Sequence, residues 1–137
     1  MRRKALVSLL CLLLLIGAAA LWARDDHMIN STLVPAAKGN VHTDTDRNGN
    51  TGVRVEVEHL AKPHDLKPSY DAYVTWIRPR GEEPLNVGEL RVNDELKGPL
   101  QTNTPYKQFD VFVTAENDAR VTQPSGPEVL RATVNRD

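Results

Sequence analysis

Short segments in which apolar and polar residues alternate recur along this 137-residue chain, and this period of two constrains the fold more than any other feature. Residues 53–58 read VRVEVE, with three valines on one face and charged residues on the other. The same alternation runs through 108–115 (QFDVFVTA) and 128–134 (EVLRATV). Because successive side chains of a strand point to opposite faces, these segments predict half-buried β-strands.

Three further segments also predict strands. Residues 70–79 (YDAYVTWIRP) carry apolar side chains at both parities, which predicts a central strand covered on both faces. In 85–92 (LNVGELRV) the apolar parity changes at Gly88, which predicts a strand with a β-bulge at that residue. Residues 95–102 (ELKGPLQT) predict another strand.

Residues that favour turns separate the predicted strands. About seven short strands at this spacing predict an all-β fold, an immunoglobulin-like Greek-key β-sandwich. We expect it to follow an N-terminal signal or anchor helix, with no other helix of useful length.

The N-terminal segment predicts export. Three basic residues at positions 2–4 precede an uncharged apolar run over residues 5–23, and polar sequence begins at Arg24. Basic residues on the cytoplasmic side set the orientation of such a segment. Ala18 and Ala20 offer a cleavage site, yet a run of roughly 17 to 25 apolar residues can also remain as an anchor. Both alternatives stay open.

These features divide the chain into a signal peptide or membrane anchor at 1–23, a polar linker at 24–38 and a β-sandwich domain at 39–137. We expect an extracytoplasmic location, either periplasmic or secreted, or anchored in the inner membrane by residues 5–23. A membrane would then be contacted only through that N-terminal segment.

Charge and cysteine content exclude several classes of function. Of 17 basic and 18 acidic residues, three basic ones precede the apolar run, so the exported part has a net charge of −4. No basic patch points to a nucleic-acid partner. The one cysteine, Cys11, lies in the apolar run, so the exported part has no disulfide, no thiolate nucleophile and no cysteine-ligated zinc.

The stretch DTDRNGNTG at 44–52 is the one weak metal candidate. Asp44, Asp46 and Asn48 have the spacing that opens a calcium-binding loop, but the twelfth position of such a loop needs an acid and is Val55 here. Asn48-Gly49 between two alternating segments favours a type I′ hairpin turn. We therefore predict a hairpin between 41–46 and 52–58, and no metal site.

Other candidate chemistry is weaker. His42, His59 and His64 would have to converge to bind zinc. Ser125 has no histidine near it in sequence, and the acids at 82 and 83 stand in a turn-rich loop. We therefore expect no enzyme and no cofactor.

The C-terminal half carries a resemblance. YVTWI at 73–77, NVGELRV at 86–92, FDVFVTAEND at 109–118 and QPSGPEVL at 123–130 follow one another in an order that resembles the extracytoplasmic C-terminal domain of anti-sigma-K-type anti-sigma factors. The residues that carry the motif are Trp76, Gly88, Thr114, Glu116, Pro124 and Gly126.

The chain also departs from that family. Only four residues precede the apolar segment, too few for a sigma-binding domain, and Asn117 and Asp118 replace the usual double glycine. We therefore expect a short exported relative: a non-enzymatic binding or structural module of the bacterial cell envelope, which contacts an envelope protein or polymer through loops or edge strands. The alternative is a membrane-anchored sensor or regulatory domain.

Two roles follow from the residues alone. Trp76 is expected at the centre of the sandwich core, as a central-strand tryptophan is in immunoglobulin-like folds. Thr114 and Glu116 stand where a strand meets a long corner, so we expect their side chains to bind backbone N–H groups of the 117–127 loop.

Overall fold

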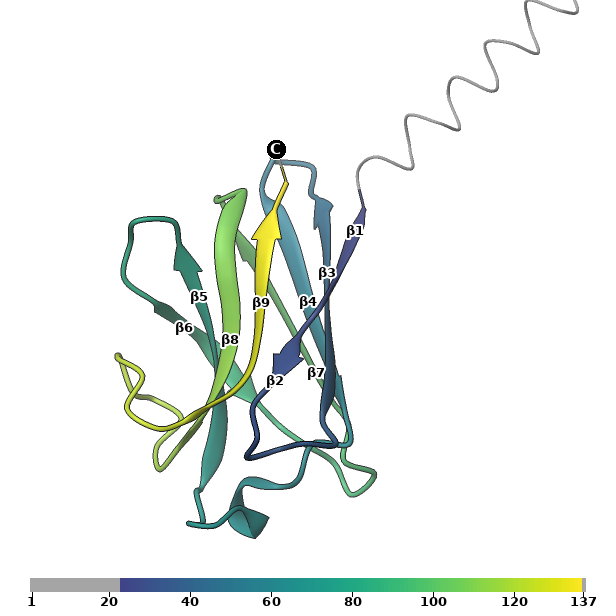
Figure 1. The fold of residues 1–137 in the computed structure, drawn as a ribbon. Helices are drawn as coiled ribbons and strands as arrows, with labels where there is room; N and C mark the ends of the chain where they lie inside the picture. Colours follow the sequence, from purple (N-terminus) through teal and green to yellow (C-terminus); the bar gives the residue numbers. More distant parts are fainter. Residues whose placement is uncertain (1–22, 137) are drawn as a thin grey trace, which may run out of the picture.

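Two antiparallel β-sheets make up the chain in a computed structural model that describes residues 23–136 (Figure 1). The predicted signal or anchor segment, except its last residue, lies outside the described residues. The strands are β1 (Arg24–His27), β2 (Ile29–Asn30), β3 (Lys38–Thr45), β4 (Thr51–Glu58), β5 (Ala72–Pro79), β6 (Leu85–Leu90), β7 (Gly98–Thr104), β8 (Gln108–Glu116) and β9 (Glu128–Asn135). One sheet has the order β1-β3-β4-β7 and the other β2-β9-β8-β5-β6. The predicted all-β fold is confirmed.

The alternating segments place their apolar faces between the two sheets. In β4, Val53, Val55 and Val57 are buried while the residues between them are exposed. The inward residues of β8 and β9 share the same core. Removing these faces from water is the main stabilising contribution to a sandwich of this kind.

Strand β5 is covered on both faces, as its sequence predicts. Tyr73 and Ile77 belong to the core between the sheets. Val74 and Trp76 point to the opposite face, where they form a second apolar cluster with Phe112 of β8. The expectation that Trp76 is the centre of the sandwich core is therefore wrong. The ring is fully buried, but it lies on the outer face of the five-stranded sheet.

Gly88 forms the bulge that the change of parity predicts. Thr75 pairs with Gly88, whereas Trp76 pairs with Asn86, so Val87 is an extra residue on β6. Gly88 has φ of +136°, a conformation that is open mainly to glycine.

The predicted hairpin is confirmed by continuous pairing of β3 with β4, from Lys38↔Glu58 to Thr45↔Thr51. The type I′ turn is wrong, because of the two central residues only Gly49 adopts a positive φ, at +80°. The N–H of Gly49 donates to the carbonyl of Asp46 at 3.2 Å, which makes the connection a longer loop with one left-handed residue.

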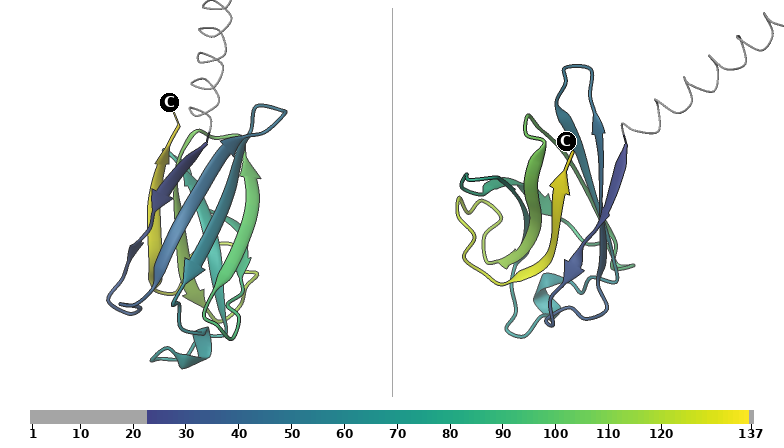
Figure 2. Two further views of the ribbon diagram at one scale, coloured as in Figure 1. Left: turned by 90° about the vertical axis from the view of Figure 1, so that its right-hand side faces the viewer. Right: turned by 45° about the horizontal axis from the view of Figure 1, so that its top comes forward.

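Residues 24–38 are not a linker. β1 pairs with β3 over four residues and β2 pairs with β9, so this segment joins both sheets (Figure 2). Met28, which stands between the two short strands, is buried. The sequence RDDH shows no alternation, because an edge strand obtains its pairing from backbone groups and can keep charged side chains in water.

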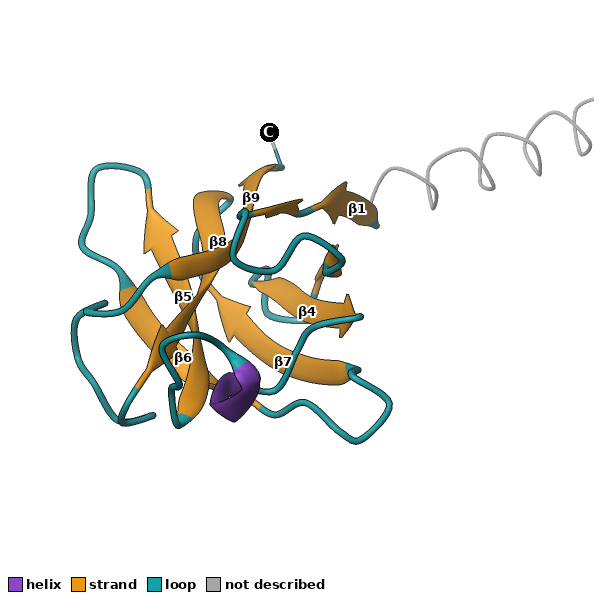
Figure 3. Ribbon diagram, turned by 60° about the horizontal axis from the view of Figure 1, so that its bottom comes forward, coloured by secondary structure: helices purple, strands orange, loops and turns teal. Residues whose placement is uncertain are grey.

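The only helical element within residues 23–136 is η1 (Pro63–Asp65), a single turn in the connection from β4 to β5 (Figure 3). In this part of the chain no helix is long and apolar enough to span a membrane. η1 lies at one end of the sandwich, and β9 ends at the other (Figure 1).

Candidate functional site

A hydrogen-bonded chain of side chains begins at the second apolar cluster. The indole Nε1 of Trp76 donates to the hydroxyl of Thr114 at 2.8 Å, and that hydroxyl donates to the carboxylate of Glu116 at 2.6 Å. The ring of Trp76 also stacks on Phe112, with centroids 6.3 Å apart and planes inclined by 17°. The indole N–H of the buried Trp76 ring is thus hydrogen-bonded, as that of a buried tryptophan usually is.

The carboxylate of Glu116 fastens the 117–127 loop. It is 1% exposed and accepts hydrogen bonds from the backbone N–H of Ser125 at 3.2 Å, the N–H of Gly126 at 3.1 Å and the hydroxyl of Ser125 at 2.5 Å. Burial raises the pKa of Glu116, but the hydrogen bonds from Ser125, Thr114 and Gly126 outweigh it and hold the pKa below its ordinary value. The predicted binding of loop N–H groups is confirmed for Glu116. It is wrong for Thr114, whose hydroxyl contacts Trp76 and Glu116 instead.

Gly126 cannot carry a side chain in this arrangement. A Cβ atom there would lie 1.7 Å from the carbonyl oxygen of Ala115. That close approach lets the carbonyl of Pro127 accept the N–H of Ala115 at 2.9 Å. Pro124 is half-buried in the same loop, next to Ser125.

Gly88 is linked to the same loop through the side chain of Asn86. Its N–H donates to the Oδ1 of Asn86 at 3.0 Å, and the Nδ2 of Asn86 donates to the carbonyls of Ala119 and Val121 at 2.9 and 2.8 Å. Ala119 and Val121 pack on the second apolar cluster. The motif residues Trp76, Gly88, Thr114, Glu116 and Gly126 therefore all help to hold one loop over one face of the sheet.

The candidate calcium ligands are used by the hairpin. The Oδ1 of Asp46 accepts the backbone N–H groups of Asn48 at 2.8 Å and Asn50 at 2.9 Å. The carboxylate of Asp44 lies over Gly52, where a Cβ would be 2.3 Å from its Oδ1. Loop N–H groups satisfied in this way explain the turn without a cation.

The histidines do not converge. The Nδ1 of His42 is 2.7 Å from the carboxylate of Asp25, and the Nδ1 of His64 is 3.9 Å from that of Asp71. His59 follows β4 with a positive φ of 54°. Within residues 23–136 no three histidine, cysteine or acidic side chains come together in a way that could hold a metal ion.

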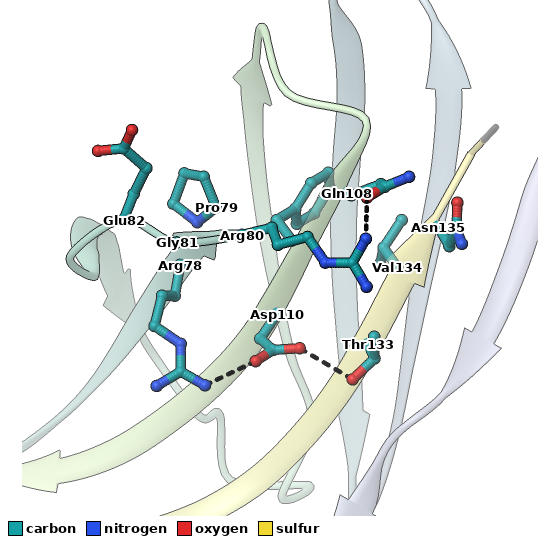
Figure 4. A pocket seen from close by; sticks show the side chains of 11 residues that line it. Arg78, Pro79, Arg80, Gly81, Glu82, Gln108, Asp110, Thr133, Val134 and Asn135 are labelled. Carbon is teal, nitrogen blue, oxygen red and sulfur yellow. Dashed lines mark hydrogen bonds and ion pairs between the residues drawn. The ribbon is translucent and has the colours of Figure 1, made fainter.

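A pocket of about 450 Å³ opens on the outer face of the five-stranded sheet, at the end where β5 and β9 finish and β8 begins (Figure 4). It is lined by residues 78–82, 108–110 and 133–135, and so combines a tight turn with the ends of three strands, β5, β8 and β9. Gly81 has a φ of +77°, which bends the chain sharply after β5.

Asp110 lies in this pocket between two guanidinium groups. Its Oδ2 is 2.8 Å from Arg78 and 3.0 Å from Arg131, and its Oδ1 accepts the hydroxyl of Thr133 at 2.9 Å. Partial burial raises the pKa of Asp110, but the hydrogen bonds from Arg78 and Thr133 and the charge of Arg131 hold it below its ordinary value. Asp110 is thus an ionised carboxylate whose charge is compensated.

Arg80 lies at the rim of the pocket and is oriented by a neutral partner. Its Nη1 donates to the Oε1 of Gln108 at 2.9 Å, and its backbone N–H donates to the carbonyl of the same residue at 3.2 Å. Among the described residues no carboxylate is within ion-pair distance of this guanidinium. The positive charge of Arg80 is therefore oriented by Gln108, but it is not neutralised by a carboxylate among the described residues.

Sequence reasoning missed this pocket. Arg78 and Arg80 are two positions apart and so share a strand face, and Asp110 has the opposite parity to Phe109. The sequence shows that these residues are polar, but it does not show that they lie side by side. Only the pairing of β5 with β8 places Arg78 next to Asp110.

A second pocket of about 480 Å³ lies beside the turn between β2 and β3. Its lysine, Lys38, pairs in register with Glu58, and Glu56 lines the same pocket. The cation there thus already has acidic neighbours, which makes it the weaker candidate.

Comparison with protein-family models, curated proteins and solved structures finds no match to this chain.

Proposed function

We propose that this chain is an exported, non-enzymatic β-sandwich module of the bacterial cell envelope, which binds an envelope protein or polymer through one end of its five-stranded sheet. The observation that carries the proposal is the pocket at the ends of β5 and β9, with the oriented guanidinium of Arg80 at its rim. Function on sandwich folds commonly resides at such ends, where loops vary on a rigid scaffold.

Export is supported by the basic residues before the apolar run of 5–23. An immunoglobulin-like Greek-key topology is supported by the strand order, since β3-β4-β7 faces β9-β8-β5-β6 and the chain changes sheet after β4, β6 and β7. Fibronectin type III domains share this sandwich architecture without sequence similarity.

The test is site-specific photo-crosslinking in intact cells. A photoreactive residue replaces Glu82, which is exposed at the pocket rim, and in a matched variant replaces Gln101, which is exposed on the outer face of β7. We expect a discrete adduct from position 82 and none from position 101. Adducts of equal yield from both positions, or none from position 82, would contradict the proposal.

A membrane-anchored sensor or regulatory domain, related to the extracytoplasmic domains of anti-sigma factors, is the second candidate. What favours it is that the residues carrying that resemblance act together on the 117–127 loop. Arg24 also donates to the carbonyl of Asn135, so the chain enters the sandwich at the pocket end. An anchor retained at 5–23 would hold that end near the membrane.

Fractionation of cells and N-terminal sequencing separate the two candidates. A soluble protein that begins near residue 21 or 24 supports the free module. An intact N-terminus in the membrane fraction supports the anchored domain, because signalling across a membrane needs a physical connection.

A further inference from the structure

We infer that the pocket at Arg80 binds the carboxylate of an acidic side chain presented by a protein partner. This inference rests on the proposed function and names the chemistry of the partner. It starts from the geometry of one guanidinium group, which has five N–H donors in a planar fork. Gln108 accepts from Nη1, which leaves the edge formed by Nε and Nη2 without a partner among the described residues.

Several other arginines of the sandwich are paired with carboxylates. Arg54 pairs with Glu56, Arg91 with Glu89 and Arg120 with Asp118 along the surface. Arg78, which lines the pocket, and Arg131, which does not, both pair with Asp110. Arg80 differs from these because its partner is an amide, and a carboxylate binds the open edge of a guanidinium through two parallel hydrogen bonds.

Arg47 provides the comparison inside the same chain. Like Arg80 it is exposed and has no carboxylate within ion-pair distance among residues 23–136, but it lies in the turn between β3 and β4 and lines neither of the two pockets. Among the described residues no hydrogen bond or ion pair orients its side chain. A guanidinium without such a partner loses conformational freedom on binding, whereas that of Arg80 is already oriented by Gln108.

The charges around the pocket favour a single negative charge on the ligand. The lining contains two guanidinium groups, Arg78 and Arg80, and two carboxylates, Asp110 and Glu82. The charge of Asp110 is neutralised by its ion pairs. A dianion would still be repelled by both carboxylates, and only one open guanidinium edge is there to bind it. A monoanionic carboxylate fits this balance better than a phosphate does.

A protein segment fits the pocket better than a small free acid. A single ion pair that is partly exposed to water contributes little affinity by itself. The pocket, at about 450 Å³, is much larger than a carboxylate group and opens beside the exposed residues Gly81 and Glu82. Residues on either side of the bound acid would fill that space and add contacts there, which a small free acid would not.

The test is a titration followed by NMR, with the protein purified as the cell exports it and in detergent if the N-terminal segment is retained. The probe is an acetylated and amidated peptide with one glutamate between two glycines on each side, and the matched control has glutamine in place of the glutamate. We expect chemical-shift changes at the Arg80 side chain and at the amides of residues 108–110 and 133–135. We expect Arg80→Gln to weaken binding by about tenfold or more, Arg80→Lys to weaken it less, and Arg47→Gln to leave it unchanged.

Three results would overturn the inference: equal binding of the glutamine peptide, unchanged binding of the glutamate peptide by Arg80→Gln with a preserved spectrum, or binding to phosphatidylglycerol vesicles and not to the glutamate peptide. The last result would identify a membrane surface as the ligand. If the peptide fails while the crosslink from position 82 persists, the carboxylate chemistry is wrong and the proposed function stands. If both fail, the proposed function fails too.

Discussion

Replacing Glu116 with glutamine should destabilise the sandwich by about 2 to 4 kcal/mol at neutral pH. Four donors converge on the carboxylate: two hydroxyls, from Thr114 and Ser125, and two backbone N–H groups, from Ser125 and Gly126. Hydrogen bonds to a charged acceptor contribute about 1.5 to 3 kcal/mol each, and neutral ones about 1 kcal/mol. Glutamine has nearly the same shape, but its NH₂ group faces donors and its oxygen is uncharged.

The assay is urea denaturation followed by circular dichroism, with Glu83→Gln as the matched control. Glu83 is exposed in the turn between β5 and β6, so its replacement should change the free energy of unfolding by no more than about 0.5 kcal/mol. The 117–127 loop should also become more accessible to protease in Glu116→Gln, because Glu116 holds Ser125 and Gly126.

The effect should depend on pH with a defined sign. The pKa of Glu116 is lowered by folding, so the contribution of its carboxylate is fully present above its ordinary pKa and is lost as the pH falls through the folded value. The difference in stability between wild type and Glu116→Gln should therefore shrink as the pH falls below about 4. A difference under about 0.5 kcal/mol at pH 7, or one that is the same at pH 7 and at pH 3, would refute this reasoning.

Three further results are expected. Trp76→Ala should lower the free energy of unfolding in urea by about 3 to 5 kcal/mol, because a fully buried ring is removed, and a loss under about 1 kcal/mol would show that the loop closes without it. Gly126→Ala should cost about 1 to 3 kcal/mol or more, since a Cβ meets the Ala115 carbonyl, and wild-type stability would contradict that contact. Calcium should leave the melting temperature unchanged, because Asp46 already accepts two backbone N–H groups, and a rise at micromolar calcium would reverse this interpretation.

The strands with clear alternation were predictable from the sequence because one face of each is buried. Val53, Val55 and Val57 all lie in the core, and the predicted range of 53–58 falls within β4. The bulge at Gly88 was predictable as well, since an extra residue shifts the parity of every side chain that follows it.

The placement of Trp76 was not predictable by the same means. The parity of β5 separates Trp76 and Val74 from Tyr73 and Ile77, but both sets are apolar, so the pattern does not say which faces the other sheet. The cover over Trp76 comes from the 117–127 loop, whose polar and turn-rich sequence resembles an ordinary surface connection. Only tertiary contacts assign it to the sheet.

The pocket at Arg80 was out of reach for a related reason. Its residues come from three strands and one turn, and none of them forms a motif along the chain. Their chemistry appears only when β8 pairs with β5 on one side and β9 on the other. Residues 24–30 likewise gave no signal, because a short edge strand needs only backbone partners.

The most direct test of the account is the crosslink from position 82 in cells that carry Arg80→Gln, compared with cells that carry Arg47→Gln. If the partner is bound through the oriented guanidinium at the pocket end, the adduct disappears with Arg80→Gln and persists with Arg47→Gln. An adduct that survives Arg80→Gln, in a protein with unchanged stability, would contradict the assignment of this end as the binding surface.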